Sequence, residues 1–133
     1  MNLVLVDTSV WIDWFGQKDL PHVSELDKLI ENRVDIALCG PILMETLQGV
    51  EDKKQRKRVE QEFSNLLYFE TKESFFTRAA DLYFSLRKKG VTIRKSVDIL
   101  IATTAMEYDL YLLHNDRDFK EIERHSKLKV WKH

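Results

Sequence analysis

The chain has 133 residues, of which 44% are hydrophobic and 32% are charged, and its formal net charge is −1. This length fits one domain, which we expect to span residues 1–133. The small net charge excludes a uniformly positive surface, so local basic patches would have to bind any polyanionic partner. No apolar run reaches about 18 residues, and Asp7 interrupts the apolar start too early for a signal peptide. We therefore expect no membrane span and a cytoplasmic location.

The first 50 residues predict two strands that are each followed by a helix. Leu3–Val6 and residues 34–39 are short apolar runs, which are typical of strands buried on both faces of a parallel sheet. Thr8 or Ser9 can cap the helix after the first strand, and Pro41 marks the helix after the second.

A further helix is predicted between these two strands. Pro21 and Ser24 open it, and Ser24 with Asp27 resembles a capping pair. The charged segment 51–64 is also helical in pattern. A solvated helix face is the simpler interpretation of its basic run 53–58, and a contact with RNA is the alternative.

Strands continue to alternate with helices in the second half of the chain. The predicted elements are a strand at 66–69, a helix at 73–89 ended by Gly90, a helix at 97–108 capped by Ser96, a strand at 110–113, a short helix near 118–124 and a last strand around 128–131. This alternation is typical of βαβ units, so we predict an α/β fold with a mainly parallel sheet.

Four acids occupy positions at which these patterns usually place an apolar residue. Asp7 and Asp116 each end a buried strand. Glu45 lies about one turn into a largely apolar helix, and Asp98 lies in the first turn of the most hydrophobic helix. Ligands bind beyond the carboxyl ends of strands in open α/β sheets, so the two strand-end acids predict one acidic site assembled from both ends of the sequence.

Each acid also has a purely structural explanation. Asp98 can complement the helix dipole, and the two strand-end acids can cap the helices that follow them. Glu45 can simply be solvated. The four acids together are stronger evidence of a metal site than any one of them. Burying an unpaired carboxylate is costly, and clustered carboxylates suit Mg²⁺ or Mn²⁺. No thiol or paired histidine accompanies these acids, which argues against zinc, and packing is favoured over ligation for His114.

The acids lie in four ordered motifs. These are Asp7-Thr8-Ser9-Val10-Trp11-Ile12, residues 42–49 around Glu45, residues 96–102 around Asp98, and Asn115-Asp116-Arg117-Asp118-Phe119. Together they resemble the PIN-domain ribonucleases over essentially the whole chain, and within that family the VapC toxins of toxin–antitoxin pairs. The resemblance implies a three-layer α/β/α fold with a mainly parallel sheet of about five strands.

The same resemblance implies the site and its chemistry. Asp7, Glu45, Asp98 and Asp116 would be the catalytic, metal-binding acids of an endoribonuclease that uses Mg²⁺, for which Mn²⁺ substitutes. Accessory positions are Thr8 and Ser9 as hydroxyls, Asn115, and Asp118 as a fifth acid. Basic residues must offset the repulsion between phosphate and these acids, and Arg94, Lys95 and Arg117 are the RNA-binding candidates.

The two acids of Asn115–Asp118 can be arranged in two ways. In an extended chain both would point to the same face, whereas in a helix residues two apart diverge. We favour a helix that begins at Arg117 or Asp118, with Asp116 toward the metal. Asp118 would then cap the helix or hold a water, so Asp116→Asn should harm activity more than Asp118→Asn.

Two kinds of partner are expected. The resemblance implies a cognate VapB-type antitoxin whose extended tail covers the acidic groove. A homodimer is predicted from the surplus of large apolar residues in so small a domain, namely Trp11, Trp14, Phe15, Phe75 and Phe76.

Other functions remain as alternatives. The chain could be an inactive PIN-like module that binds RNA or protein, although such a module would have eroded acids and here all four are present. It could also be a PIN nuclease of RNA processing rather than a toxin. A response-regulator receiver needs a pair of early acids, and a haloacid-dehalogenase-type phosphatase needs aspartate where Ser9 stands.

Overall fold

The computed structural model describes residues 2–133 and contains a five-stranded parallel sheet with strand order β3-β2-β1-β4-β5. The strands are β1 (Leu3–Val6), β2 (Asp35–Leu38), β3 (Leu67–Tyr68), β4 (Tyr111–Leu113) and β5 (Lys129–Val130). The helices are α1 (Thr8–Phe15), α2 (Pro21–Glu31), α3 (Gly40–Gln48), α4 (Lys53–Phe63), α5 (Glu73–Lys88), α6 (Ser96–Glu107) and α7 (Arg117–Arg124). The predicted α/β fold with a five-stranded parallel sheet is confirmed.

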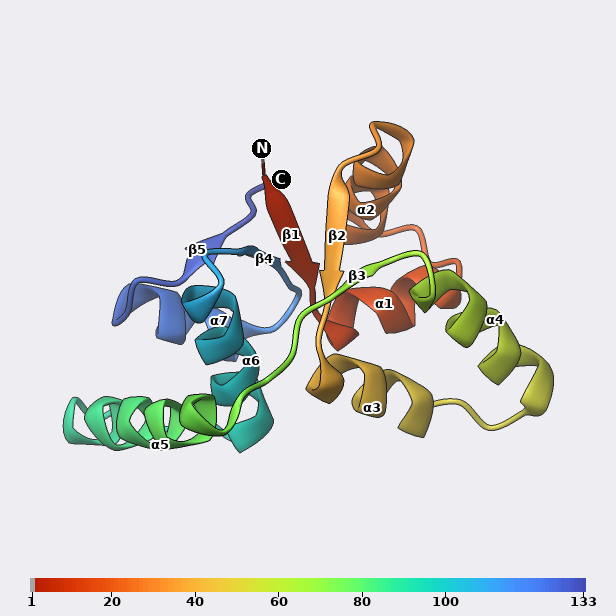
Figure 1. Cartoon of the computed structure of the whole chain (residues 1–133). Coiled ribbons are helices and arrows are strands. Elements are labelled where there is room, and N and C mark those ends of the chain that lie inside the picture. The colour runs from red at the N-terminus through yellow and green to blue at the C-terminus, as the bar shows by residue number, and fades with distance from the viewer. Residues whose placement is uncertain (1) are drawn as a thin grey trace.

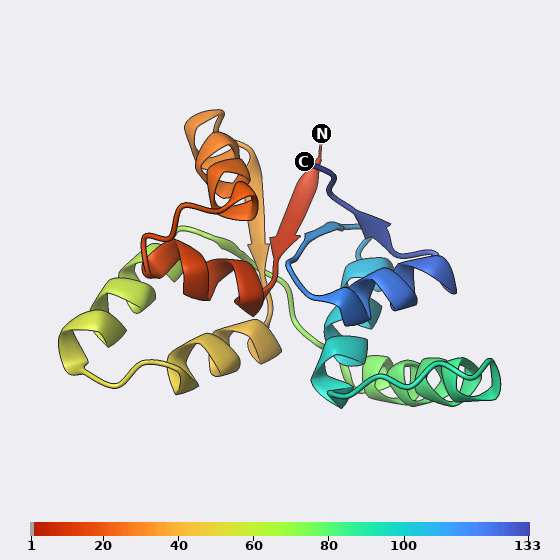
Figure 2. The same ribbon diagram turned by 180° about the vertical axis from the view of Figure 1, so that it is seen from behind.

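Strand β1 is the central strand of the sheet. It pairs with β2 on one side and with β4 on the other, and Val4, Leu5 and Val6 are fully buried. Figure 1 shows α1–α4 gathered on the β2 side of β1 and α5–α7 on the β4 side, and Figure 2 shows the same division from behind. The order of the strands therefore reverses at β1, and crevices that bind ligands occur at such reversals.

Three helix starts differ from the predictions. Asp7, and not Thr8 or Ser9, caps α1, because its carboxylate accepts the Ser9 backbone N–H at 3.0 Å. Helix α2 begins at Pro21, whose fixed φ suits a first helical position, so Ser24 lies inside the helix and caps nothing. Ser96 is the first residue of α6, and the N-cap position belongs to Lys95.

Most of the large apolar residues that suggested a dimer belong to the core. Trp11 is fully buried and packs on Trp14, Phe15 and Phe63 with ring centroids 5.0–5.8 Å apart. Phe75 is buried as well. Of the five residues, only Phe76 is a large exposed apolar side chain, so this surplus is explained by core packing and the basis of the dimer prediction is much reduced.

Two further predictions, the glycine that ends α5 and the helix within 51–64, are confirmed. Gly90 follows α5 with a φ of +79°, the left-handed conformation that commonly ends a helix. The basic run 53–58 lies largely exposed on α4, while Val59 and Phe63 of the same helix are buried. Among residues 2–133, no helix combines the length and the apolar character that a membrane span requires.

Candidate functional site

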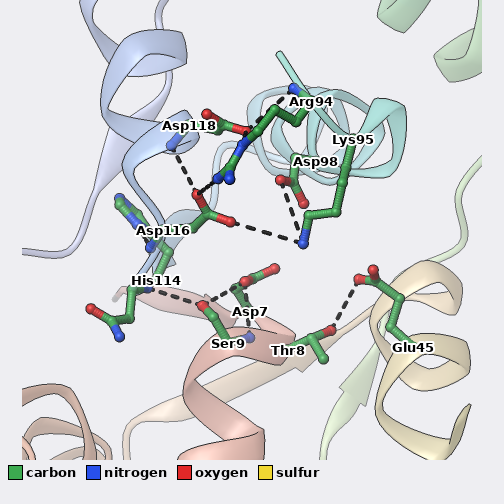
Figure 3. Close-up of polar contacts among 11 residues, drawn as sticks. Asp7, Thr8, Ser9, Glu45, Arg94, Lys95, Asp98, His114, Asp116 and Asp118 are labelled. Carbon is green, nitrogen blue, oxygen red and sulfur yellow. Dashed lines mark hydrogen bonds and ion pairs between the residues drawn. The ribbon is translucent and has the colours of Figure 1, made fainter. Parts of the chain in front are cut away.

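The ends of β1 and β4 are tied together by one hydroxyl group. Ser9 donates a hydrogen bond of 2.7 Å to Asp7 Oδ2, and its oxygen accepts the Asn115 backbone N–H at 3.0 Å. The Asp7 backbone N–H also donates to the Leu113 carbonyl at 2.9 Å. These bonds hold Asp7 and the segment that carries Asp116 at one edge of the sheet, as Figure 3 shows, so the predicted meeting of the two ends of the sequence is confirmed.

Each strand-end aspartate divides its two oxygens between two tasks. Asp7 Oδ2 accepts the bonds from Ser9, whereas Oδ1 is buried without any hydrogen-bond partner. Asp116 Oδ1 accepts the Asp118 N–H at 2.9 Å and thereby caps α7, whereas Oδ2 faces the Lys95 ammonium at 3.9 Å. The capping role of these acids therefore does not exhaust them, because the cap uses only one oxygen of each.

Three aspartates form the tightest group. One carboxylate oxygen from each of Asp98, Asp116 and Asp118 lies within 4.8 Å of the others. Asp98 is only 2% exposed, and its Oδ2 has no hydrogen-bond partner. A buried orphan oxygen beside two further carboxylates fits a hard divalent cation, which binds oxygen ligands.

The structure confirms the predicted helix start beside Asp118 and rules out one of the two roles predicted for this residue, the helix cap. Helix α7 begins at Arg117, as favoured. The capping residue, however, is Asp116, because it is the last extended residue before the helix and its carboxylate reaches the Asp118 N–H. Asp118 is left free to turn inward, where it is buried in the acid group.

Glu45 approaches from the opposite side of the site. It lies on α3, and its Oε1 accepts a hydrogen bond of 3.2 Å from the Thr8 hydroxyl. Figure 3 shows Glu45 across from the group of Asp98, Asp116 and Asp118, with Asp7 and Thr8 between them. The structure thus gathers the four predicted acids in one region, but Glu45 and Asp7 stand outside the group of three that is within 4.8 Å.

Mutual repulsion and burial disturb the ionisation of these acids. The pKa of Asp98 is raised to about 7, mainly by burial and also by the charges of Asp7, Asp116 and Glu45, whereas the charge of Lys95 opposes the shift. Burial also raises the pKa of Asp7, more than its hydrogen bonds with Ser9 lower it, and the charge of Glu45 adds to the increase. Both acids therefore resist deprotonation unless a cation compensates them.

Two of the three RNA-binding candidates contact the acids directly. Arg94 Nε lies 3.2 Å from Asp118 Oδ2, and its Nη2 lies 3.5 Å from Asp116 Oδ1. Lys95 Nζ lies 3.9–4.0 Å from oxygens of Asp98 and Asp116. The sequence interpretation missed these ion pairs. The spacing of Lys95 and Asp98 at the start of α6 was the available signal, because residues three apart on a helix are neighbours.

His114 supports the site without entering it. Its buried ring packs on Phe119 with centroids 5.1 Å apart, in agreement with the predicted packing role. Nδ1 lies 3.1 Å from the Asp116 backbone nitrogen and accepts its N–H. Burial lowers the pKa of His114 to about 4, so the ring is neutral near pH 7 and retains this acceptor.

The arrangement has counterparts among known proteins. The PIN domain family matches residues 4–125. The chain belongs to this family. PIN membership replaces the receiver and phosphatase alternatives, since the match includes all the acids of the site.

Relatives place this PIN domain near the VapC ribonucleases. Ribonuclease VapC11 of Mycobacterium tuberculosis is 32% identical over 130 residues, which cover 96% of this chain and 97% of that protein. Among solved structures, DNA-bound VapBC from Salmonella typhimurium gives a TM-score of 0.77 at 22% identity and 98% coverage of both chains. VapBC2 from Rickettsia felis, bound to a promoter DNA fragment, gives 0.76 at 21% identity and 97% coverage of both.

The ionisation of Asp98 generates a testable pH dependence for the PIN domain in chelator. The pKa of about 7 in the folded state lies above the usual value of 3.8, so between these pH values the folded state binds more protons than the unfolded state. The free energy of unfolding should therefore fall as pH rises through this window. Across this pH window, the free energy of unfolding of wild type should fall by roughly 2–4 kcal/mol more than that of Asp98→Asn. The size follows because a shift of one pKa unit corresponds to about 1.4 kcal/mol.

Urea unfolding on both sides of this window measures the effect. Asp81→Asn is the matched control, because Asp81 is exposed on α5, and it should follow the wild-type pH dependence. Parallel pH dependences for wild type and Asp98→Asn would contradict the ionisation assigned to Asp98.

Proposed function

We propose that this chain is a metal-dependent endoribonuclease that hydrolyses RNA phosphodiester bonds and acts as the toxin of a toxin–antitoxin pair. The observation that carries the proposal is the group of Asp98, Asp116 and Asp118, in which the buried Asp98 Oδ2 lacks a hydrogen-bond partner. The 32% identical relative named a ribonuclease supports it. An inactive binding module would have no need to bury these unpaired acids, whose cost is high.

The metal would be Mg²⁺, with Mn²⁺ able to substitute. Asp98 and Asp116 are candidate ligands whose oxygens lie within 4.8 Å of each other, Asp7 offers its unpartnered Oδ1, and Glu45 faces them from α3. All these donors are carboxylate oxygens, which both ions prefer. A divalent ion held there supplies the Lewis acidity that phosphodiester hydrolysis requires.

The chain itself contributes orientation and charge. Hydrolysis adds the oxygen of water to phosphorus and breaks the bond from phosphorus to a ribose oxygen. The caps of α1 and α7 fix Asp7 and Asp116 at one oxygen each, so the other oxygen keeps its direction. The Thr8 hydroxyl orients Glu45 in the same way through Oε1. Fixed donors need no reorganisation during reaction, which favours catalysis.

A neighbouring cleft offers a path for the RNA strand. It has a volume of about 440 Å³, and its lining includes Asp116, Arg117, Lys120, Trp131 and Lys132. Arg117 and Lys120 make no ion pair with any residue between 2 and 133, whereas Lys132 pairs with Glu123 at 2.9 Å. Unpaired cations beside an acidic centre are suited to phosphates that flank the cleaved bond.

The first prediction from the proposed function concerns the metal. Purified protein should cleave RNA with Mg²⁺ or Mn²⁺ and stop in chelator, because the carboxylates then lack the cation that offsets their charge. Asp98→Asn should abolish cleavage while leaving the fold intact, since amide and carboxylate have similar shapes. Gel assays of RNA cleavage and circular dichroism measure the two effects, with Asp81→Asn as the active control. Undiminished cleavage in chelator would refute the mechanism.

The second prediction separates two neighbouring acids. Asp116→Asn should be nearly inactive at saturating Mn²⁺, because the variant loses a proposed ligand. Asp118→Asn should lose about 10–100-fold, the usual cost of a residue that orients a ligand, because Asp118 holds Arg94 at 3.2 Å beside Asp116. Initial rates on one RNA substrate measure both variants. If Asp118→Asn lost more activity than Asp116→Asn, Asp118 would itself be the more important ligand.

The partners complete the proposed function. The VapBC neighbours are complexes, and by analogy we propose a VapB-type antitoxin that covers the acid group through an extended tail, within the cytoplasm. A basic side chain of that tail would pair with the carboxylates and compete with metal. A homodimer also belongs to this proposal, with Phe76 and Phe84 as large exposed apolar side chains of α5.

The third prediction tests these partners. The product of a neighbouring gene that encodes a small DNA-binding protein should copurify with this chain and suppress its RNA cleavage. Analytical ultracentrifugation of the isolated chain should show a dimer. Full RNase activity with saturating partner would contradict coverage of the acids, and a monomer at high micromolar concentration would contradict the homodimer.

A further inference from the structure

The side chain of Lys95 approaches two of the three grouped aspartates, Asp98 and Asp116. Its Nζ lies 4.0 Å from Asp98 Oδ2 and 3.9 Å from Asp116 Oδ2. Figure 3 shows the ammonium group with one dashed contact to each of these two residues. At these distances the ammonium lowers the electrostatic repulsion between the acids but makes no hydrogen bond, and Asp98 Oδ2 remains without a partner.

Lys95 is held loosely, in contrast to its neighbour. Its side chain is 54% exposed and has no other ion pair among residues 2–133. Arg94 is anchored more firmly, because both its backbone N–H and its Nε point to Asp118 Oδ2, at 3.4 and 3.2 Å. The Lys95 ammonium can therefore swing into solvent on its flexible stem while the backbone of α6 stays in place.

We propose that Lys95 is a tethered counter-cation that competes with a divalent ion for Asp98 and Asp116. This inference rests on the proposed metal site. An ammonium group and a divalent ion near the same oxygens repel each other, so binding of the ion displaces the ammonium. Lys95 thereby lowers the affinity of the site for metal and sets the metal concentration at which the site fills.

Binding of Mn²⁺ alone, measured by isothermal titration calorimetry without RNA, tests the proposal. Lys95→Met keeps the length of the side chain and removes its charge, so it should bind Mn²⁺ about tenfold more tightly, the effect expected from losing two half-exposed ion pairs. Lys95→Arg keeps the charge and should stay close to wild type. The matched control is Lys89→Met, the same exchange at an exposed position beyond α5, and it should not change the affinity.

A second measurement distinguishes competition from simple structural support. In chelator, Lys95→Met should unfold at a lower temperature than wild type, because the acids lose a compensating charge. Saturating Mn²⁺ should then raise its unfolding temperature more than that of wild type, since tighter binding stabilises the folded state more. If Lys95 only holds the acids in position, Lys95→Met would bind Mn²⁺ more weakly than wild type, and Mn²⁺ would raise its unfolding temperature less.

The outcomes separate this inference from the proposed function. Asp98→Asn identifies the site, because the variant should lose the measured binding. If wild type binds Mn²⁺ through Asp98 but Lys95→Met binds equally or more weakly, the competition is refuted and the metal site stands. If neither protein binds Mn²⁺, both proposals fall. If Lys95→Met binds Mn²⁺ and wild type does not, competition is supported, because the Lys95 ammonium then prevents binding altogether.

Discussion

Two carboxylates at the ends of adjacent buried strands each hold a helix start with one oxygen and leave the other oxygen directed toward the acidic site. The rest of the site depends on this division. Asp7 and Asp116 cannot turn away, because the bonds to Ser9 and Asp118 fix them. Helix N-termini also favour negative charge, so the capping oxygens need no further cation. The second oxygens are thereby oriented by secondary structure and not by a flexible loop.

The remaining acids make the site electrostatically unfavourable in itself. Asp98 is buried near other acids, and its pKa of about 7 reflects desolvation first and then repulsion from Asp7, Asp116 and Glu45. The protein supplies partial compensation from residues 94–95, just before α6, where Arg94 and Lys95 approach the same oxygens. Arg94 fixes Asp118, whereas Lys95 is mobile enough to give way. Stability and chemistry therefore make opposite demands on Asp98, as is common at functional sites.

Local patterns in the sequence determine how much of the fold and of the acidic site could be predicted. Buried strands and the acids that end them are encoded within a few residues, so β1, β4 and the meeting of Asp7 with Asp116 followed from sequence. The inward turn of Asp118 did not, because it depends on which neighbouring acid takes the cap. The burial of Trp11 and Phe15 likewise depends on Phe63, which is distant in sequence and packs on Trp11 only once α4 is in place. Contacts between distant parts of the sequence also decide that Arg94 faces Asp116 and Asp118.

The pairing of β1 with β4 has a consequence for synthesis of the chain. Asp7 emerges from the ribosome well before the segment from Asp98 to Asp118, part of which meets it through the Asn115 N–H and the Leu113 carbonyl. Domains fold as units, and contacts so distant in sequence form late. A nascent chain therefore carries no assembled acidic site until the segment from Asp98 to Asp118 has also been made. The strand order thus separates the synthesis of Asp7 from the moment at which the site can form.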